Sequence, residues 1–116
     1  MIVQKRLTAV FYRTSAGREP VREWLWSLDD EARKQIGEDL QGIEFGWPIG
    51  LPLCRPMGKG LYEMRSTLGS RIARLFFVPT NDRLVVLHAF IKKTQATPKT
   101  ELDIARTRQR DWEKNR

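Results

Sequence analysis

The most strand-like run in the chain is R-L-V-V-L-H-A-F-I-K-K at residues 83–93. Its valine, isoleucine and phenylalanine residues favour extended backbone. Apolar residues fill most positions, and this pattern predicts a central strand that is buried on both faces of a sheet. The run ends in Lys92 and Lys93, whose side chains point to opposite faces because they are neighbours on a strand. A buried strand that ends in two lysine ammonium groups is well suited to bind a polyanion.

Three shorter patterns predict further strands. Residues 5–13 alternate between an apolar and a mixed face, which indicates a first strand. Residues 61–66 and 71–78 are separated by a turn at 67–70, and together they predict a hairpin. A second turn at 79–82 leads into the run at 83–93, so the last three strands are expected to form a meander.

Helix signals lie before and after these strands. Pro20 fits the first turn of a helix, and apolar residues follow it at helical spacing. Asp29 is the expected N-cap of a second helix that ends at residues 46–48. The short junction between the two helices predicts a hairpin packed on one face of the sheet. Thr97 and Pro98 are the expected N-cap and first residue of the last helix.

Residues 46–60 contain four glycines and three prolines, and we expect an irregular loop that crosses a sheet edge. The predicted order is therefore β-α-α-β-β-β-α. Because the helices are segregated from a run of strands, the fold class is α+β, with a small, largely antiparallel sheet. A chain of 116 residues is expected to form one domain, spanning residues 1–116.

The net charge of the chain limits the classes of molecule that it is expected to bind. The net charge is +7, and residues 61–116 hold almost all of it, with 12 Lys and Arg against 6 Asp and Glu. This asymmetry indicates nucleic acid, an acidic protein partner, or both. The single cysteine, Cys54, excludes an internal disulfide and a cysteine-rich zinc site. No apolar run is long enough for a membrane span or a signal core, so the expected location is the cytoplasm.

Familiar catalytic patterns are absent from the sequence. It has one histidine, His88, no H-E-x-x-H and no glycine-rich phosphate loop, so we expect no metal ion and no cofactor. Arginine, lysine, tyrosine and one histidine can still support RNA cleavage, because the ribose 2′-hydroxyl is itself the nucleophile. The protein then has to align the RNA, stabilise the developing negative charge and move protons.

The candidate catalytic residues are ionisable side chains of the meander: Arg65, Arg74, His88, Lys92 and Lys93. The candidate RNA-binding residues are Arg65, Arg71, Lys92, Lys93 and Tyr62. Each has an ordinary structural alternative, since strand arginines and terminal lysines are commonly solvated and a lone histidine is often structural. We expect Arg74 to be exposed, so that Arg74→Ala would leave the fold intact.

Four segments carry a family resemblance: L-Y-E-M-R-S at 61–66, R-I-A-R-L-F-F at 71–77, L-H-A-F-I-K-K-T at 87–94 and T-P-K-x-E-L-x-x-A at 97–105. In these segments and in its order of elements, the chain resembles the RelE/ParE toxin superfamily, and within it the phage-derived, HigB-like branch. The resemblance implies the toxin of a type II toxin–antitoxin pair. It further implies a metal-independent endoribonuclease that cuts mRNA, often on the ribosome, and thereby arrests translation and growth.

The resemblance also implies roles for single residues. Arg74 falls on the arginine that holds the scissile phosphate, and Arg65 closes the preceding strand. Lys92 and Lys93 fall on the basic end of the third strand, and His88 on the family histidine. Glu63 is a departure, since some ribosome-dependent relatives have lysines along that strand.

The resemblance implies an antitoxin with a helix-turn-helix fold, encoded in an adjacent reading frame. Apolar residues of the last helix are expected to pack on the sheet, which leaves its arginines, Arg106, Arg108 and Arg110, to face the partner or RNA. Two other functions stay open. The ParE-like branch shares the fold and inhibits DNA gyrase without catalysis, and a plain RNA-binding module would bind without cleaving.

Overall fold

The computed structural model describes residues 4–92 and 98–115. Its elements follow the chain in the order β1 (Thr8–Phe11), α1 (Pro20–Trp26), α2 (Asp30–Gly46), β2 (Cys54–Gly58), β3 (Leu61–Leu68), β4 (Arg71–Pro79), β5 (Arg83–Lys92) and α3 (Lys99–Asn115). The predicted α+β class is confirmed, and the structure adds one strand to the predicted order.

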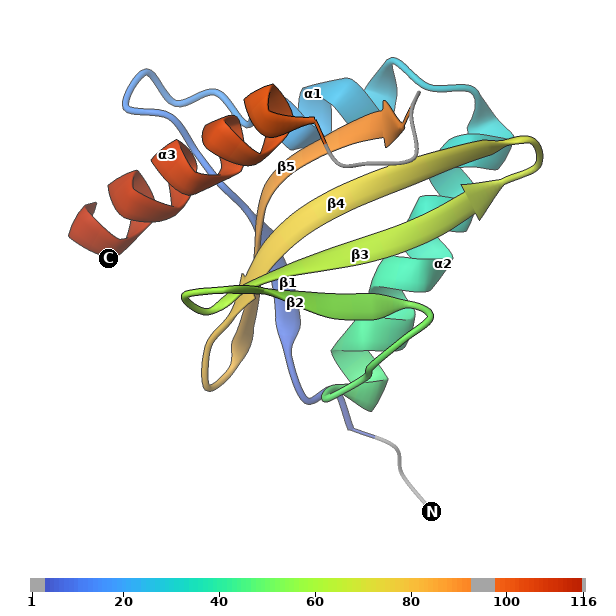
Figure 1. Cartoon of the computed structure of the whole chain (residues 1–116), viewed down its shortest axis with the longest axis horizontal. Helices are drawn as coiled ribbons and strands as arrows, with labels where there is room; N and C mark the ends of the chain where they lie inside the picture. Colours follow the sequence, from blue (N-terminus) through green and yellow to red (C-terminus); the bar gives the residue numbers. More distant parts are fainter. Residues whose placement is uncertain (1–3, 93–97, 116) are drawn as a thin grey trace.

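The strands form one five-stranded sheet in the order β1-β5-β4-β3-β2 (Figure 1). β1 runs parallel to β5, and every other neighbouring pair is antiparallel. The meander of β3, β4 and β5 is therefore confirmed. β5 lies inside the sheet between β1 and β4, and its residues 84–87 are buried, as the apolar run predicted.

β2 corrects the prediction of an irregular segment at 46–60. Cys54 pairs with Met64 of β3, and the register shifts between Pro56 and Gly58. β2 is an edge strand, where a proline needs no partner for a backbone N–H. The proline and glycine content excluded a central strand from this segment but did not exclude an edge strand.

β1 is shorter than the predicted strand at 5–13. The backbone N–H groups of Arg6 and Leu7 both donate to the carbonyl of Glu44 at the end of α2, at 2.8 and 3.0 Å. The Glu44 carboxylate then accepts from the backbone N–H of Ala9 at 2.8 Å. The residues before Thr8 are thus bound to a helix end rather than to the sheet, and this contact is not visible in a local sequence pattern.

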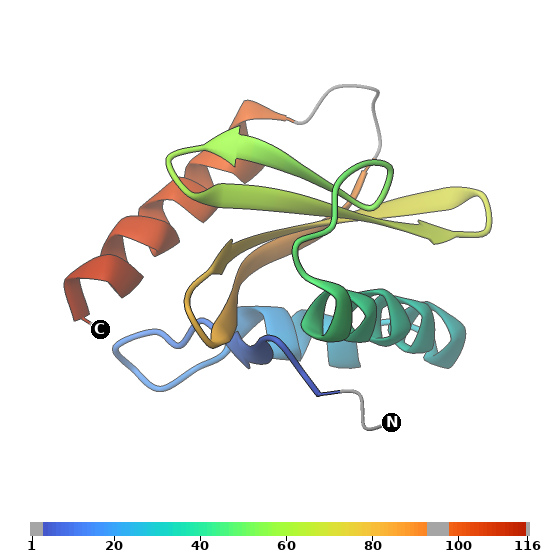
Figure 2. The same cartoon turned by 90° about the horizontal axis from the view of Figure 1, so that it is seen from below.

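The two faces of the sheet carry separate apolar cores. α1 and α2 cover one face, and α3 lies on the other (Figure 2). Side chains of β4 alternate between the cores, since Leu75 and Phe77 pack toward α2 whereas Phe76 and Val78 belong to the α3 side. The predicted helical hairpin on one face is confirmed, and any side chain of the meander can be assigned to a face.

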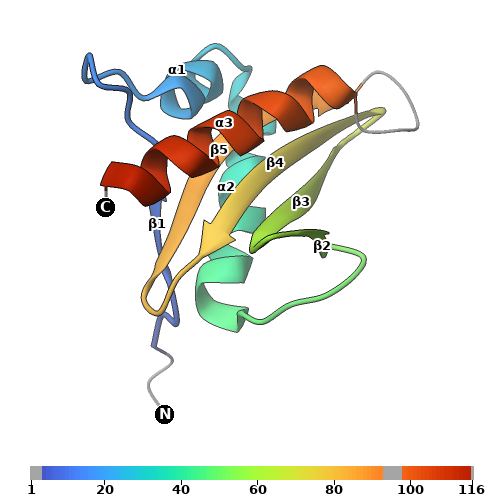
Figure 3. The same ribbon diagram turned by 60° about the vertical axis from the view of Figure 1, so that its left-hand side comes forward.

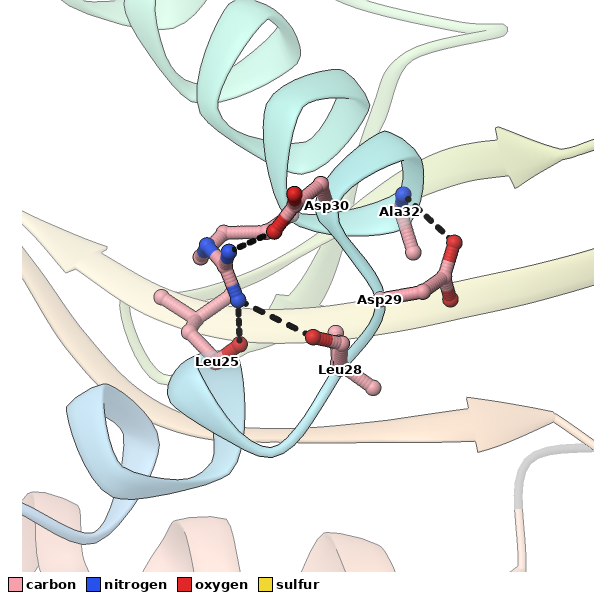
Figure 4. A network of polar contacts seen from close by, with 6 residues as sticks. Leu25, Leu28, Asp29, Asp30 and Ala32 are labelled. Atoms are coloured by element: carbon pink, nitrogen blue, oxygen red, sulfur yellow. Dashed lines mark hydrogen bonds and ion pairs between the residues drawn. The ribbon is translucent and has the colours of Figure 1, made fainter.

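The junction between α1 and α2 is fixed by polar contacts (Figure 4). The Asp29 carboxylate accepts from the backbone N–H of Ala32 at 3.3 Å, which confirms it as the N-cap of α2. Arg33 donates to the carbonyls of Leu25 at 3.3 Å and Leu28 at 2.9 Å, and it pairs with Asp30. One arginine thus bonds to carbonyls at the end of α1 and to the first turn of α2.

α3 is held to the sheet by polar contacts as well as by its apolar stripe. Ala105 is buried, and Leu102 and Trp112 pack against the same core, as predicted. Arg106 donates to the carbonyls of residues 57 and 58 at the end of β2, at 2.6 and 2.8 Å. Arg108 donates to the carbonyl of Leu87 at 2.9 Å. The prediction that the arginines of this helix face outward is therefore wrong for Arg106 and Arg108. The expected N-cap, Thr97, lies outside the described residues.

Candidate functional site

α3 leaves part of its own face of the sheet uncovered. It crosses β5, whereas β2 and β3 lie beside it without a helix above them (Figure 3). On this face the register pairs Arg65 of β3 with Arg74 of β4, and Arg74 with Phe90 of β5. Arg55 of β2 faces Glu63 of β3 in the adjacent row. Lys92, the last residue of β5, is close enough to Arg74, Arg55 and Arg65 to interact with their charges. We call Arg55, Arg65, Arg74 and Lys92 the basic cluster.

A buried carboxylate lies in the middle of the basic cluster. Glu63 is 1% exposed, and its Oε1 accepts from Arg55 Nε and from Arg74 Nη1, each at 3.0 Å. Burial of a carboxylate is unfavourable unless the charge is paired and hydrogen-bonded, and two guanidinium groups meet that requirement here. Glu63 therefore joins two arginines from the strands on either side of it.

Arg74 is the most enclosed member of the basic cluster. It is 8% exposed, which corrects the sequence-based prediction of an exposed arginine. Desolvation lowers the pKa of its guanidinium, and Arg65 and Arg55 lower it further, while Glu63 acts in the opposite direction. Its Nε is buried without a hydrogen-bond partner in the described part of the chain. A buried donor of this kind is unusual, and an incoming anion would satisfy it.

Lys92 and Arg65 form the accessible side of the basic cluster. Arg65 is exposed and Lys92 is half-buried. Partial desolvation lowers the pKa of Lys92, and the charge of Arg74 adds to this effect, as do Arg55 and Arg65 more weakly. The pKa of Lys92 thus depends on the same charged side chains that lie near Arg74. The structure brings together three of the predicted site residues, Arg65, Arg74 and Lys92.

His88 lies beneath α3. Its Nε2 is 2.8 Å from the Glu101 carboxylate, and its Nδ1 is 3.3 Å from Arg108 Nη1. Arginine can only donate, so Nδ1 accepts and Nε2 carries the proton shared with Glu101. Phe76 separates His88 from Glu63 in their cross-strand row. Both ring nitrogens are therefore engaged by α3, and the structure does not bring His88 into the basic cluster.

Two further candidates lie on the opposite face. The Tyr62 ring packs against Trp47, with centroids 4.9 Å apart, and against Phe77 at 5.8 Å. Arg71 forms an ion pair with the capping Asp29 at 3.2 Å. Both side chains contribute to the layer of α1 and α2, away from the basic cluster. Lys93 lies outside the described residues.

Sequence reasoning missed Arg55 and the role of Glu63. Arg55 stands in the segment that was expected to be irregular, so no face could be assigned to it. Glu63 was noted only as a departure from a family pattern. An acidic residue at alternate spacing to Arg65 on a predicted strand was the one available signal, since both side chains then share a face.

Comparison with known proteins matches residues 23–110 to the family model described as "Phage derived protein Gp49-like (DUF891)". The chain belongs to this family of phage-derived Gp49-like proteins. It is also similar to proteins named "Probable endoribonuclease HigB1" from two strains of Mycobacterium tuberculosis, CDC 1551 / Oshkosh and H37Rv. Each is 29% identical over 105 residues, which cover 90% of this chain and 83% of the relative. The resemblance to the phage-derived, HigB-like branch of the RelE/ParE superfamily is confirmed.

The Gp49-like chain contains no group of three or more His, Cys, Asp or Glu side chains placed to hold a metal ion within residues 4–92 and 98–115. Over the same residues, no helix is both long and apolar enough to cross a membrane. Cys54 is buried, and desolvation raises the pKa of its thiol to about 12, which makes it a poor nucleophile.

The contacts of His88 predict a pH dependence of folding. Burial lowers the pKa of His88, and although Glu101 raises it, the net direction is downward. Below about pH 6.5 the unfolded chain therefore takes up a proton that the folded protein resists. The stability from the neutral ring is complete above that pH and is lost as the pH falls toward the lower, folded-state pKa.

Urea unfolding at about pH 7 and about pH 5 measures this effect. The free energy of unfolding of the wild type is expected to fall more over this interval than that of His88→Gln, which cannot titrate there. Equal losses in the two proteins would contradict the lowered pKa of the buried His88.

Proposed function

We propose that this Gp49-like chain is the toxin of a type II toxin–antitoxin pair and cleaves mRNA at the basic cluster without a metal ion. The observation that carries the proposal is the buried Arg74 guanidinium on the uncovered part of the sheet, whose Nε has no hydrogen-bond partner among residues 4–92 and 98–115. Arg55, Arg65 and Lys92 surround it, and a relative of similar length is named a probable endoribonuclease.

The proposed reaction uses the RNA as its own nucleophile. The ribose 2′-oxygen attacks the adjacent phosphorus, the bond to the 5′-oxygen of the next nucleotide breaks, and the products end in a 2′,3′-cyclic phosphate and a 5′-hydroxyl. The phosphorane gains negative charge, which Arg74 and Arg65 stabilise through forked donors. The 2′-hydroxyl loses its proton and the leaving oxygen gains one.

Lys92 and His88 are the residues proposed to transfer protons. The lowered pKa of Lys92 makes it a better proton donor than an ordinary lysine, and it borders Arg74. His88 stays a predicted proton carrier, and that role requires it to exchange its contact with Glu101 or Arg108. Lys93 stays a predicted source of further positive charge.

The proposed partner is an antitoxin from an adjacent reading frame with a helix-turn-helix fold. The net charge of +7 favours a partner whose contacting surface is acidic, since complementary charge speeds association and selects the partner. Its binding would cover or distort the basic cluster and suppress cleavage. We place the pair in the cytoplasm, where mRNA and ribosomes are found. Co-purification of a neighbouring gene product, with loss of cleavage in the complex, would support this arrangement, and an active complex would contradict it.

The test of the proposed function is to incubate the purified protein with mRNA, with and without ribosomes. Cleavage in either mixture supports the proposal, and the comparison shows whether ribosomes are required. Cleavage of ribosome-free RNA is expected to persist in EDTA. Protein that binds RNA but never cuts it would overturn the catalytic proposal in favour of an RNA-binding module. Inhibition of DNA gyrase without RNA cleavage would favour the ParE-like alternative.

A further inference from the structure

The Arg55–Glu63–Arg74 contact has a feature that stability alone does not explain. A buried ion pair is weak evidence for stability, because well-packed apolar residues of similar size serve as well or better. Here the pair lies beside the exposed Arg65 and the half-buried Lys92, and neither Glu63 nor Arg74 belongs to an apolar core. Glu63 therefore has a role in arranging charge on the uncovered face.

The geometry of Arg74 indicates what that role is. Glu63 contacts Nη1 at 3.0 Å, on the side of the guanidinium away from Nε. Nε and Nη2 form the edge that can bind a phosphate through two parallel hydrogen bonds. Nε is buried and has no partner among the described residues. Glu63 thus holds Arg74 through Nη1 and does not occupy Nε.

The charge of Glu63 has a second consequence. Arg74 and Lys92 are both affected by neighbouring arginines, whose repulsion Glu63 opposes. Removing the carboxylate would raise the net positive charge of the basic cluster and release Arg74 from its anchor at the same time. RNA would then be attracted more strongly to a site that is less well arranged.

We propose that Glu63 is a positioning residue that orients Arg74 and Arg55 for the phosphate and limits RNA affinity in favour of turnover. This inference rests on the proposed function. A purely structural role would leave the kcat of a folded variant unchanged when the charge of Glu63 is removed, whereas a positioning role lowers it.

Glu63→Gln is the main test, since it keeps the size and one acceptor oxygen but removes the charge. Binding to a non-cleavable RNA with 2′-O-methyl riboses is expected to tighten several-fold, with a log–log salt slope steeper by about 1. The kcat for cleavable RNA is expected to fall by about 10- to 100-fold, because small misplacements of a catalytic group are costly. KM and kcat should therefore fall together.

Two variants complete the experiment. Glu63→Asp keeps the charge on a shorter side chain. It should lower kcat, while the affinity for RNA and the salt dependence of binding stay at wild-type values. If Glu63→Gln does not fold, Glu63→Asp serves as the test. Glu31→Gln removes one negative charge from the exposed surface of α2 and should change neither property. Thermal unfolding of each variant verifies that it is folded.

The outcomes separate the two proposals. Wild-type protein that neither binds nor cleaves RNA would overturn the proposed function. An active wild type, with Glu63→Gln and Glu63→Asp both indistinguishable from it, would overturn only the positioning role. Weaker RNA binding by folded Glu63→Gln would also overturn it, because added positive charge should strengthen that binding.

Discussion

Arg74→Lys is expected to lower the rate of RNA cleavage by about 10²- to 10³-fold while the protein stays folded. Lysine keeps a positive charge beside the buried Glu63 carboxylate, but it lacks the planar fork and the Nε donor of arginine. Single-turnover cleavage, with thermal unfolding of the same samples, measures both properties. Arg110→Lys on the exposed side of α3 is the matched control and should cut RNA at the wild-type rate. Wild-type activity in folded Arg74→Lys would remove the guanidinium from the mechanism.

Arg74→Ala is expected to destabilise the fold by about 2 kcal/mol, because it leaves buried Glu63 with one fewer partner. The loss is smaller than for a fully broken buried pair, since Arg55 still donates to Glu63. Adding Glu63→Gln to Arg74→Ala should cost less than the sum of the single changes, by about 1 kcal/mol.

Urea unfolding of the two single variants and the double variant measures this coupling. Arg65→Ala is the reference, because Arg65 is exposed, and it should change the free energy of unfolding by no more than about 0.5 kcal/mol. If Arg74→Ala proved as stable as Arg65→Ala, the result would contradict a buried ion pair between Arg74 and Glu63. The sequence-based prediction of an exposed arginine would then hold.

Elements fixed by local signals could be predicted from the sequence. Pro20 and Asp29 begin α1 and cap α2 through contacts within a few residues, and the apolar run of β5 requires burial wherever it packs. The edge strand β2 could not be predicted, because its pairing with β3 outweighs the local preferences of Pro56 and Gly58. The start of β1 was misplaced because a distant carbonyl, that of Glu44, binds the preceding residues.

Side chains alternate between the two faces of a strand, and the part of the candidate site that depends on this alternation could be predicted from the sequence. Alternation places Arg65 and Arg74 on one face and Tyr62 on the other, which the register confirms. Burial of Arg74 depends on Glu63, and the contacts of His88 depend on where α3 crosses the sheet. Such contacts between distant segments leave no periodic signal in the sequence.

Cleavage of an RNA that carries a single 2′-deoxyribose at the position the protein cuts tests whether the RNA supplies its own nucleophile. If the 2′-hydroxyl is the nucleophile at the basic cluster, that bond stays intact, while the matched all-ribose RNA is cut and leaves a 2′,3′-cyclic phosphate and a 5′-hydroxyl. Cleavage of the substituted bond at the same rate, or products with 5′-phosphate ends, would contradict the account.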